Sequence, residues 1–306
     1  MDERLVGLLL AAAVASGAPL LWAAIGELVS ERAGVINIEL EGMMLSGAFA
    51  GVLGALLSGS VVGGFAAAAV GGLLVAAVHG LLCFVFRANQ VVSGVVLNIL
   101  TLGVTTFLLS TVLASRATRS VGGLPRLPIP VLSDIPLVGG AFFDQNVMVY
   151  AAYLAVPLTW WILRRTPIGL ALTAVGERPE AAASLGISVA RVRWLALLAC
   201  GVLAGIGGGL LALAGLGFFT QNMTAGRGFI ALAAVVFGRW SPLGTAGAVL
   251  LFSLADAFQI RAQALGLGVP YQFLVMLPYV VTLVALAGLL TRMRAPAALG
   301  VNYAQE

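Results

Sequence analysis

The sequence predicts an all-α protein that crosses a membrane several times, and three observations support this prediction. Of its 306 residues, 61% are hydrophobic and only 9% are charged, whereas a soluble protein has about a quarter of its residues charged. The mean hydropathy of +1.08 is too high for soluble cores in a chain of this size. The apolar residues form long runs without the alternation of an outer-membrane barrel. Because a backbone in lipid must satisfy its own hydrogen bonds, we expect these runs to be helices.

Eight apolar runs are each long enough to cross a bilayer as a helix. They are residues 5–28, 35–57, 61–86, 91–114, 147–163, 194–217, 243–260 and 269–290. The first run follows an acidic start instead of a basic one, which favours a spanning helix over a cleaved signal peptide. We therefore expect one transmembrane domain over residues 1–306.

A further membrane segment is expected at residues 218–238. It opens with a polar stretch and continues with only eleven residues of apolar, helix-like sequence, which is too short to span alone. The segment either re-enters and leaves on one side, or crosses as an unwound strand followed by a half helix. The positive-inside rule favours crossing, since crossing places more arginines in the cytoplasm. We thus expect about nine membrane segments, with the N-terminus outside and the C-terminus inside.

Two long loops connect these runs on opposite sides of the membrane. Residues 115–146 contain prolines and glycine pairs, and we expect an ordered extracytoplasmic loop that contacts something arriving from outside. Residues 164–193 hold five arginines and two glutamates, so we expect a cytoplasmic loop. Within the runs, small residues recur at four-residue spacing, for example at Gly201, Gly205 and Gly209. This spacing indicates helices that pack closely in lipid.

The sequence lacks residues that several classes of function require. All 16 basic residues are arginine, and without lysine the chain can form neither a P-loop ATPase site nor a Schiff base. Cys83 and Cys200 lie in apolar runs and are interpreted as core thiols. His79 stands alone and is interpreted as helix packing, with a polar pore contact as the alternative. We expect no catalytic group, no metal site and no binding of nucleic acid.

The stretch 176–187 in the cytoplasmic loop is expected to form a short surface helix. Pro179 suits the first turn of a helix, and Gly186 suits its end. Glu177 and Glu180 favour the positive N-terminal end of that helix. From this chemistry alone, a plain loop between two spans is an equal alternative.

This stretch also resembles a signature of bacterial ABC importer permeases. Glu180, Ala181 and Ala182, followed by Gly186, are similar to their Glu-Ala-Ala-x-x-x-Gly motif. The resemblance implies a short helix that docks in a groove on an ATPase subunit. The coupling residues would then be Gly176, Glu177, Pro179, Glu180, Ala181, Ala182 and Gly186.

Longer blocks narrow the resemblance. Residues 26–45 are similar to the N-terminal block of the branched-chain amino acid, ribose and nucleoside permease family. Residues 222–233 and 237–244 resemble its nucleoside and simple-sugar branch. The sequence departs from the family pattern at Glu39, where a small residue is usual, and after Arg193, where the leucine-proline end of the signature is missing.

The resemblance implies a permease subunit of an ATP-driven importer in the bacterial cytoplasmic membrane. ATP and Mg would bind to separate cytoplasmic ATPase subunits, so no cofactor is expected in this chain. The other implied partners are a second, related permease and an extracytoplasmic substrate-binding protein. The rival interpretation is an ion-coupled secondary transporter, in which Glu41 and Asp256 would be relay carboxylates.

Polar residues inside the predicted spans are candidates for the substrate path, because polar groups in lipid are costly and need a reason. They are Asn37, Glu41, Gln90, Ser93, Asn98, Asn222, Thr224, Asp256 and Gln259. Amides and hydroxyls suit a neutral cargo that bears hydroxyl groups. The resemblance favours nucleosides, then simple sugars, then branched-chain amino acids. The alternative role for each residue is a hydrogen bond between helices that fixes the bundle.

Overall fold

The computed structural model describes residues 3–113, 123–264, 272, 273, 276, 280 and 294–303. Seven helical segments in these ranges are long and apolar enough to cross a membrane, so the chain is a multi-pass membrane protein. They comprise α1 (Glu3–Arg32), α2 (Leu40–Ser58), α3 (Val61–Gly80) with the π-helical turn η1 (Leu81–Val85), α4 (Gln90–Leu108) with η2 (Leu109–Leu113), α6 (Val147–Arg165), α9 (Val189–Leu210) with η3 (Leu211–Leu216), and α11 (Pro242–Ala264). The span predicted at 269–290 lies outside the described residues, apart from isolated positions.

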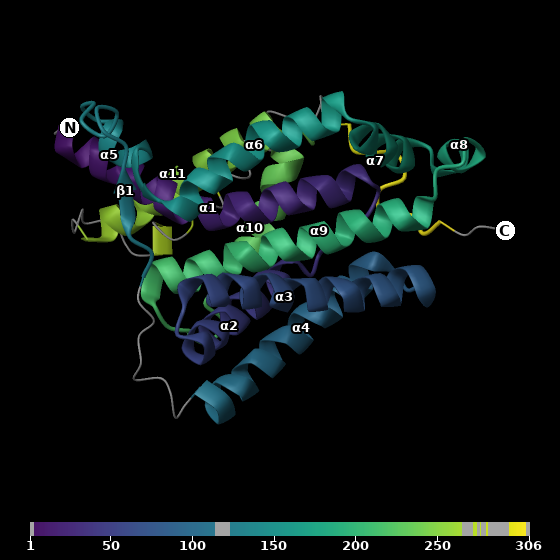
Figure 1. The fold of residues 1–306 in the computed structure, drawn as a ribbon, viewed down its shortest axis with the longest axis horizontal. Coiled ribbons are helices and arrows are strands. Elements are labelled where there is room, and N and C mark those ends of the chain that lie inside the picture. The colour runs from purple at the N-terminus through teal and green to yellow at the C-terminus, as the bar shows by residue number, and fades with distance from the viewer. Residues whose placement is uncertain are drawn as a thin grey trace.

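Helices α1, α2 and α9 form the centre of the bundle, and α4 and α6 lie at its edge (Figure 1). In their most apolar stretches, 61% of α1, 67% of α2 and 61% of α9 are buried, against 28% of α4 and 22% of α6. Ile25 and Leu28 of α1 share one buried apolar cluster with Leu197 of α9. The apolar side chains that α4 and α6 expose suit a lipid environment.

Glycines bring α2, α3 and α9 into close contact. A Cβ on Gly208 of α9 would collide with the carbonyl oxygen of Met44 in α2. A Cβ on Gly72 of α3 would collide with the carbonyl oxygen of Gly201 in α9. The close packing predicted from the small-residue spacing is therefore confirmed at these helices.

The second predicted span begins later than its apolar run. The run starts at residue 35, but α2 starts at Leu40, and a non-helical linker occupies residues 33–39. Gly34 adopts φ +86° at the end of α1, a conformation that favours glycine. Its N–H donates to the carbonyl oxygen of Glu31 at 2.9 Å, as in a helix cap closed by a left-handed residue. Hydropathy does not show where an apolar run leaves the helical path.

The loop 164–193 contains two helices instead of one. Helix α8 (Pro179–Ser184) lies where the short surface helix is predicted, and Gly186 follows it at φ +83°. Helix α7 (Pro167–Glu177) is an addition to the predicted elements. Its start is marked in the sequence, since Thr166 accepts a hydrogen bond from the N–H of Gly169 at 3.3 Å and proline takes the first helical position.

The described part of the loop 115–146, residues 123–146, corrects the all-α prediction locally. Strand β1 (Arg126–Pro128) pairs antiparallel with β2 (Asp144–Asn146), with Leu127 opposite Gln145. The short helix α5 (Gly139–Phe142) precedes β2. The Tyr150 hydroxyl of α6 donates to the carbonyl oxygen of Leu127 at 2.9 Å, so the hairpin is held to the membrane bundle. The bundle itself is helical.

The segment 218–238 contains a helix that is too short to span a bilayer. Helix α10 (Arg227–Phe237) has 11 residues and follows turns over residues 221–226. Before these turns, Phe219 packs edge-on against Phe49 of α2, with ring centroids 5.4 Å apart. Beyond α10, the Arg32 guanidinium donates to the carbonyl oxygen of Trp240 at 2.6 and 2.9 Å. The segment therefore runs from the side of α2 to the C-terminal end of α1.

The contact of α9 with α2 predicts the effect of one added methyl group. Gly208→Ala should lower the melting temperature of the detergent-solubilised chain, because the helices must separate to admit the Cβ, at a cost of about 1–3 kcal/mol. Gly103→Ala on α4 is the matched control, since a Cβ there meets nothing within 4 Å. Thermal unfolding followed by size-exclusion chromatography measures both variants. Equal melting temperatures would contradict the close contact.

Candidate functional site

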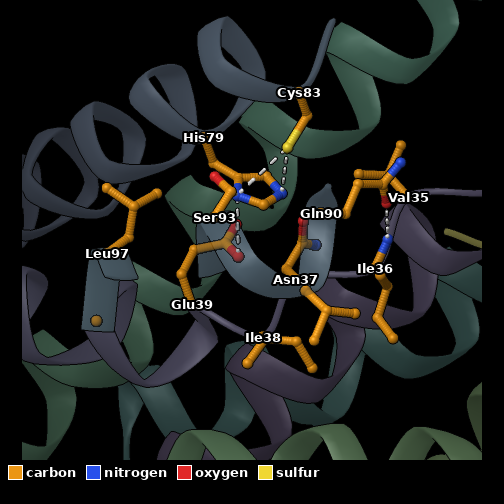
Figure 2. Close-up of polar contacts among 12 residues, drawn as sticks. Val35, Ile36, Asn37, Ile38, Glu39, His79, Cys83, Gln90, Ser93 and Leu97 are labelled. Atoms are coloured by element: carbon orange, nitrogen blue, oxygen red, sulfur yellow. Dashed lines mark hydrogen bonds and ion pairs between the residues drawn. The ribbon is translucent and has the colours of Figure 1, made fainter. Parts of the chain in front are cut away.

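Buried polar contacts join the linker 33–39 to neighbouring helices, and Figure 2 shows those with Gln90 of α4 and His79 of α3. Asn37 donates from its backbone N–H to Glu27 Oε1 at 3.1 Å and from Nδ2 to Glu27 Oε2 at 2.7 Å. At the start of α4, Gln90 Oε1 accepts from the N–H of Ile36 at 3.0 Å. The predicted path residues Asn37 and Gln90 therefore hold the linker against α1 and α4.

Glu39 and His79 form a buried pair that the sequence does not connect (Figure 2). Glu39 Oε2 lies 3.2 Å from His79 Nδ1, and neither side chain is exposed. The Ser93 hydroxyl lies 3.3 Å from the same nitrogen, and the Cys83 thiol lies 3.5 Å from Nε2. The departure from the family pattern at Glu39 is the sequence signal that marks this pair.

Glu41 binds the N-terminus of α10. Its Oε1 accepts from the Thr224 hydroxyl at 2.6 Å and from the N–H of Gly226 at 2.8 Å. Its Oε2 accepts from the N–H of Gly228 at 2.6 Å. The first N–H groups of a helix lack partners within the helix and its N-terminal end is positive, so a carboxylate stabilises it. Two predicted path residues, Glu41 and Thr224, are thus bonded to each other.

Asn98 connects α4 to the start of α2. Its Oδ1 accepts from the N–H of Gly42 at 2.8 Å, and its Nδ2 donates to the carbonyl oxygen of Ile38 at 2.8 Å. Six of the nine predicted path residues therefore make hydrogen bonds between segments of the bundle. They are Asn37, Glu41, Gln90, Ser93, Asn98 and Thr224.

Three predicted path residues lie in a more open environment. Asn222 is exposed and adopts φ +52° in the turns before α10. Asp256 of α11 is half-buried, and its Oδ2 lies 4.0 Å from the Arg227 guanidinium. Gln259 follows on the same face of α11, three residues later, and is also half-buried. Arg227, the first residue of α10, is missing from the sequence prediction, although it ends the polar stretch that marks this segment.

Two apolar cavities lie away from these residues. One, of about 300 Å³, lies between α1, α6 and α11 and is lined by Leu21 and Val249 among others. The second, of about 470 Å³, lies between α1, α6, α7 and α9 and is lined by Ile25 and Leu203 among others. Neither cavity is lined by a predicted path residue. Within the described part of the chain, no three His, Cys, Asp or Glu side chains are grouped to hold a metal ion.

Helix α8 has a buried face and an exposed face, and it extends at one end of the molecule (Figure 1). Pro179 and Ala182 are buried, and Ala182 packs with Val175 of α7 and Val189 of α9. The exposed residues from Glu177 to Gly186 are Glu177, Arg178, Glu180, Ala181, Ser184, Leu185 and Gly186. The predicted coupling residues are thus divided between a face that anchors α8 and a face open to another protein.

Leu185 adds an apolar group to the exposed face of α8. Leu185 directly follows the helix, and its side chain is 82% exposed. In a chain with this many leucines, the sequence gives no signal that one of them is exposed. Gly176 has the opposite role, because a Cβ there would collide with the carbonyl oxygen of Arg32. The end of α7 is therefore held closely against the end of α1.

Comparisons with known proteins show which family the chain belongs to. Residues 9–289 match the family described as branched-chain amino acid transport system / permease component. The guanosine ABC transporter permease protein NupQ of Bacillus subtilis is 39% identical over 98% of this chain and 97% of its own length. The nucleoside ABC transporter permease protein NupC of Lactococcus lactis is 37% identical over 93% of each chain. No solved structure matches the chain.

A third relative widens the range of named cargoes. The putative glucose ABC transporter permease protein TsgC13 of Haloferax volcanii is 41% identical over 85% of this chain and 79% of its own length. The similarity extends over nearly the whole chain in these relatives, as it does in the family match. The family predicted from residues 26–45 and from the motif in α8 is thereby confirmed. The chain belongs to the branched-chain amino acid transport system / permease component family and is a permease subunit of an ABC importer.

Proposed function

We propose that this permease imports nucleosides. The observation that carries the proposal is the near full-length similarity to two permeases named for guanosine and for nucleosides. A relative named for glucose makes a simple sugar the second candidate. Branched-chain amino acids are the third, because the family description names them.

The open polar groups support a neutral cargo. The amides of Asn222 and Gln259 can each donate and accept hydrogen bonds, as the hydroxyls and base edges of a nucleoside require. Arg227 and Asp256 lie 4.0 Å apart and offset each other's charge. An amino acid would need separate ionic partners for its ammonium and carboxylate groups. Nucleosides and sugars need none.

We also propose that residues 218–238 cross the membrane as an unwound strand followed by the half helix α10. The N-terminus of α10 meets Glu41 in the first turn of α2, and the chain beyond its C-terminus meets Arg32 at the end of α1. With the seven described spans and the predicted run at 269–290, this crossing makes nine membrane segments. Half-helix ends are common at transport sites. Asn222, Asp256 and Gln259 would then border the substrate path.

The partners follow from an ABC permease in the bacterial cytoplasmic membrane. The exposed face of α8 would dock on a cytoplasmic ATPase subunit, which binds ATP and Mg. The extracytoplasmic hairpin of β1 and β2 would meet a substrate-binding protein, and a second, related permease would complete the pathway. An ion-coupled transporter is disfavoured, because Glu41 is held by α10 and Asp256 lies beside Arg227.

Reversing one charge on α8 tests the docking. Glu180→Arg should reduce the ATPase subunit that copurifies with the permease at least about tenfold, a loss of about 1.4 kcal/mol, because like charges in an interface repel. Asp134→Arg, on the exposed extracytoplasmic loop, is the control and should copurify normally. Quantitative gel analysis of both complexes measures the effect. Normal recovery with Glu180→Arg would refute the docking at α8.

Thiol labelling tests the position of the broken segment. With Cys83 and Cys200 replaced by alanine, Asn222→Cys should react with a membrane-impermeant thiol reagent, because this residue is exposed. Thr224→Cys is the buried control and should react at least about tenfold more slowly, as buried thiols are inert. Mass spectrometry gives both rates. If the thiol of the Asn222→Cys variant is shielded in both the resting and the ATP-bound complex, the segment does not border the path.

Uptake measurements test the cargo. The complex reconstituted with its ATPase and substrate-binding subunits should accumulate radiolabelled inosine or uridine in an ATP-dependent manner. Glucose and leucine under the same conditions are the competing cargoes. We expect nucleoside uptake to exceed both by at least about tenfold. Glucose lacks the base edges of a nucleoside and leucine lacks its hydroxyls too, and a site that hydrogen-bonds its substrate rejects analogues without those groups. Transport of leucine or glucose without nucleosides would disprove the proposal.

A further inference from the structure

Residues 294–303, called the strap here, lie across the end of the bundle that carries α7 and α8 (Figure 1). The N–H of Ala298 donates to the carbonyl oxygen of Gly176, at the end of α7, at 2.8 Å. The N–H of Gly300 donates to the carbonyl oxygen of Gly34, in the linker 33–39, at 3.1 Å. The strap is therefore bonded to the element before α8 and to the linker between α1 and α2.

The last described residues of the strap reach α4 and α8. Asn302 Nδ2 donates to the carbonyl oxygens of Arg87 and Ala88 at 3.1 and 3.0 Å, and Asn302 Oδ1 accepts from Gln90 Nε2 at 3.3 Å. Tyr303 packs against the cluster that Ala182 of α8 forms with its neighbours. The strap thus contacts the turn that precedes α4 and the buried face of α8.

Arg193 joins the strap to the linker from inside the protein. Its side chain is only 2% exposed. Nε donates to the carbonyl oxygen of Ala33 at 3.2 Å, and the terminal nitrogen Nη1 donates to the carbonyl oxygen of Val301 at 2.7 Å. The planar fork of donors in arginine can hold two separate carbonyl groups, which a lysine ammonium cannot match in geometry.

Gly34 makes the approach of these three segments possible. A Cβ at this position would lie 2.9 Å from the carbonyl oxygen of Ala298 and 3.0 Å from the Arg193 guanidinium. Its φ of +86° also disfavours any other residue. The linker, the strap and α9 therefore meet at a point with no room for a side chain at position 34.

From these contacts we infer that Arg193 and the strap couple the linker 33–39 to α7 and α8. When the ATPase moves α7 and α8, this coupling moves the linker and carries the movement into the bundle. This inference rests on the proposed docking at α8. Helix α8 has only six residues and its own connections are short loops. The strap hydrogen-bonds the end of α7 and the linker, and it packs Tyr303 against the cluster of α8. Glu41 links the start of α2 onward to α10.

The test measures transport per ATP in the complete complex reconstituted in vesicles. Arg193→Gln removes the guanidinium, and Asn302→Ala removes an exposed side chain that bonds the turn before α4. In each variant, we expect solute transported per ATP hydrolysed to fall at least about fivefold, the lower range of allosteric coupling. ATP hydrolysis without the substrate-binding protein should continue, which a merely unfolded permease would not allow. Arg191→Gln is the matched control, because Arg191 is exposed two residues away.

The outcomes separate this inference from the docking proposal. If Glu180→Arg loses the ATPase subunit but Asn302→Ala keeps normal transport per ATP, the strap inference is overturned and docking stands. If Glu180→Arg still copurifies the ATPase, docking at α8 fails, whatever the strap variants do. If Arg193→Gln does not accumulate in the membrane, Asn302→Ala alone decides. An equal loss with Arg191→Gln would also overturn the inference, since Arg191 is exposed and is not among the hydrogen-bond partners found for the described residues of the strap.

Discussion

A chain that leaves the helical path inside a membrane protein must find a partner for each backbone polar group, because lipid offers none. The linker 33–39 meets this constraint with groups from other helices. Its carbonyl and N–H groups bond the side chains of Arg193, Gln90 and Asn98. These side chains come from α4 and α9, so the positions of both helices are tied to the linker. The places of α2 and α10 depend on the same short segment.

Most of the predicted path residues form hydrogen bonds that hold the linker and the helices beside it together. The amide of Asn37 bonds Glu27, and the carboxylate of Glu41 bonds the start of α10. A polar side chain in an apolar run can thus have either of two roles: it hydrogen-bonds another segment of the bundle, or it contacts cargo. In this chain, the polar residues near the linker have the first role. The groups left more open lie beside the N-terminus of α10, at Asn222 and Asp256.

The sequence predicts elements that depend on composition and local chemistry. The apolar runs locate the described spans, and proline with glycine locates α8. The linker 33–39 could not be predicted, because its break depends on partners far along the chain, such as Arg193. The pairing of Glu39 with His79 also depends on residues far apart in the chain, since Glu39 directly precedes α2 and His79 lies forty positions later, near the end of α3. Local signals did exist for α7, where Thr166 precedes a proline.

The carboxylate that closes the N-terminus of α10 has a consequence for the charge of the solutes that pass it. A free helix N-terminus attracts phosphate and carboxylate groups. Here Glu41 already accepts the N–H groups of Gly226 and Gly228, so an anion arriving at this helix end finds its donors taken and a negative charge in place. A phosphorylated solute would be repelled where its unphosphorylated form is not. If the substrate path passes this helix end, as proposed above, the bond that fixes the half helix would also disfavour nucleotides and sugar phosphates.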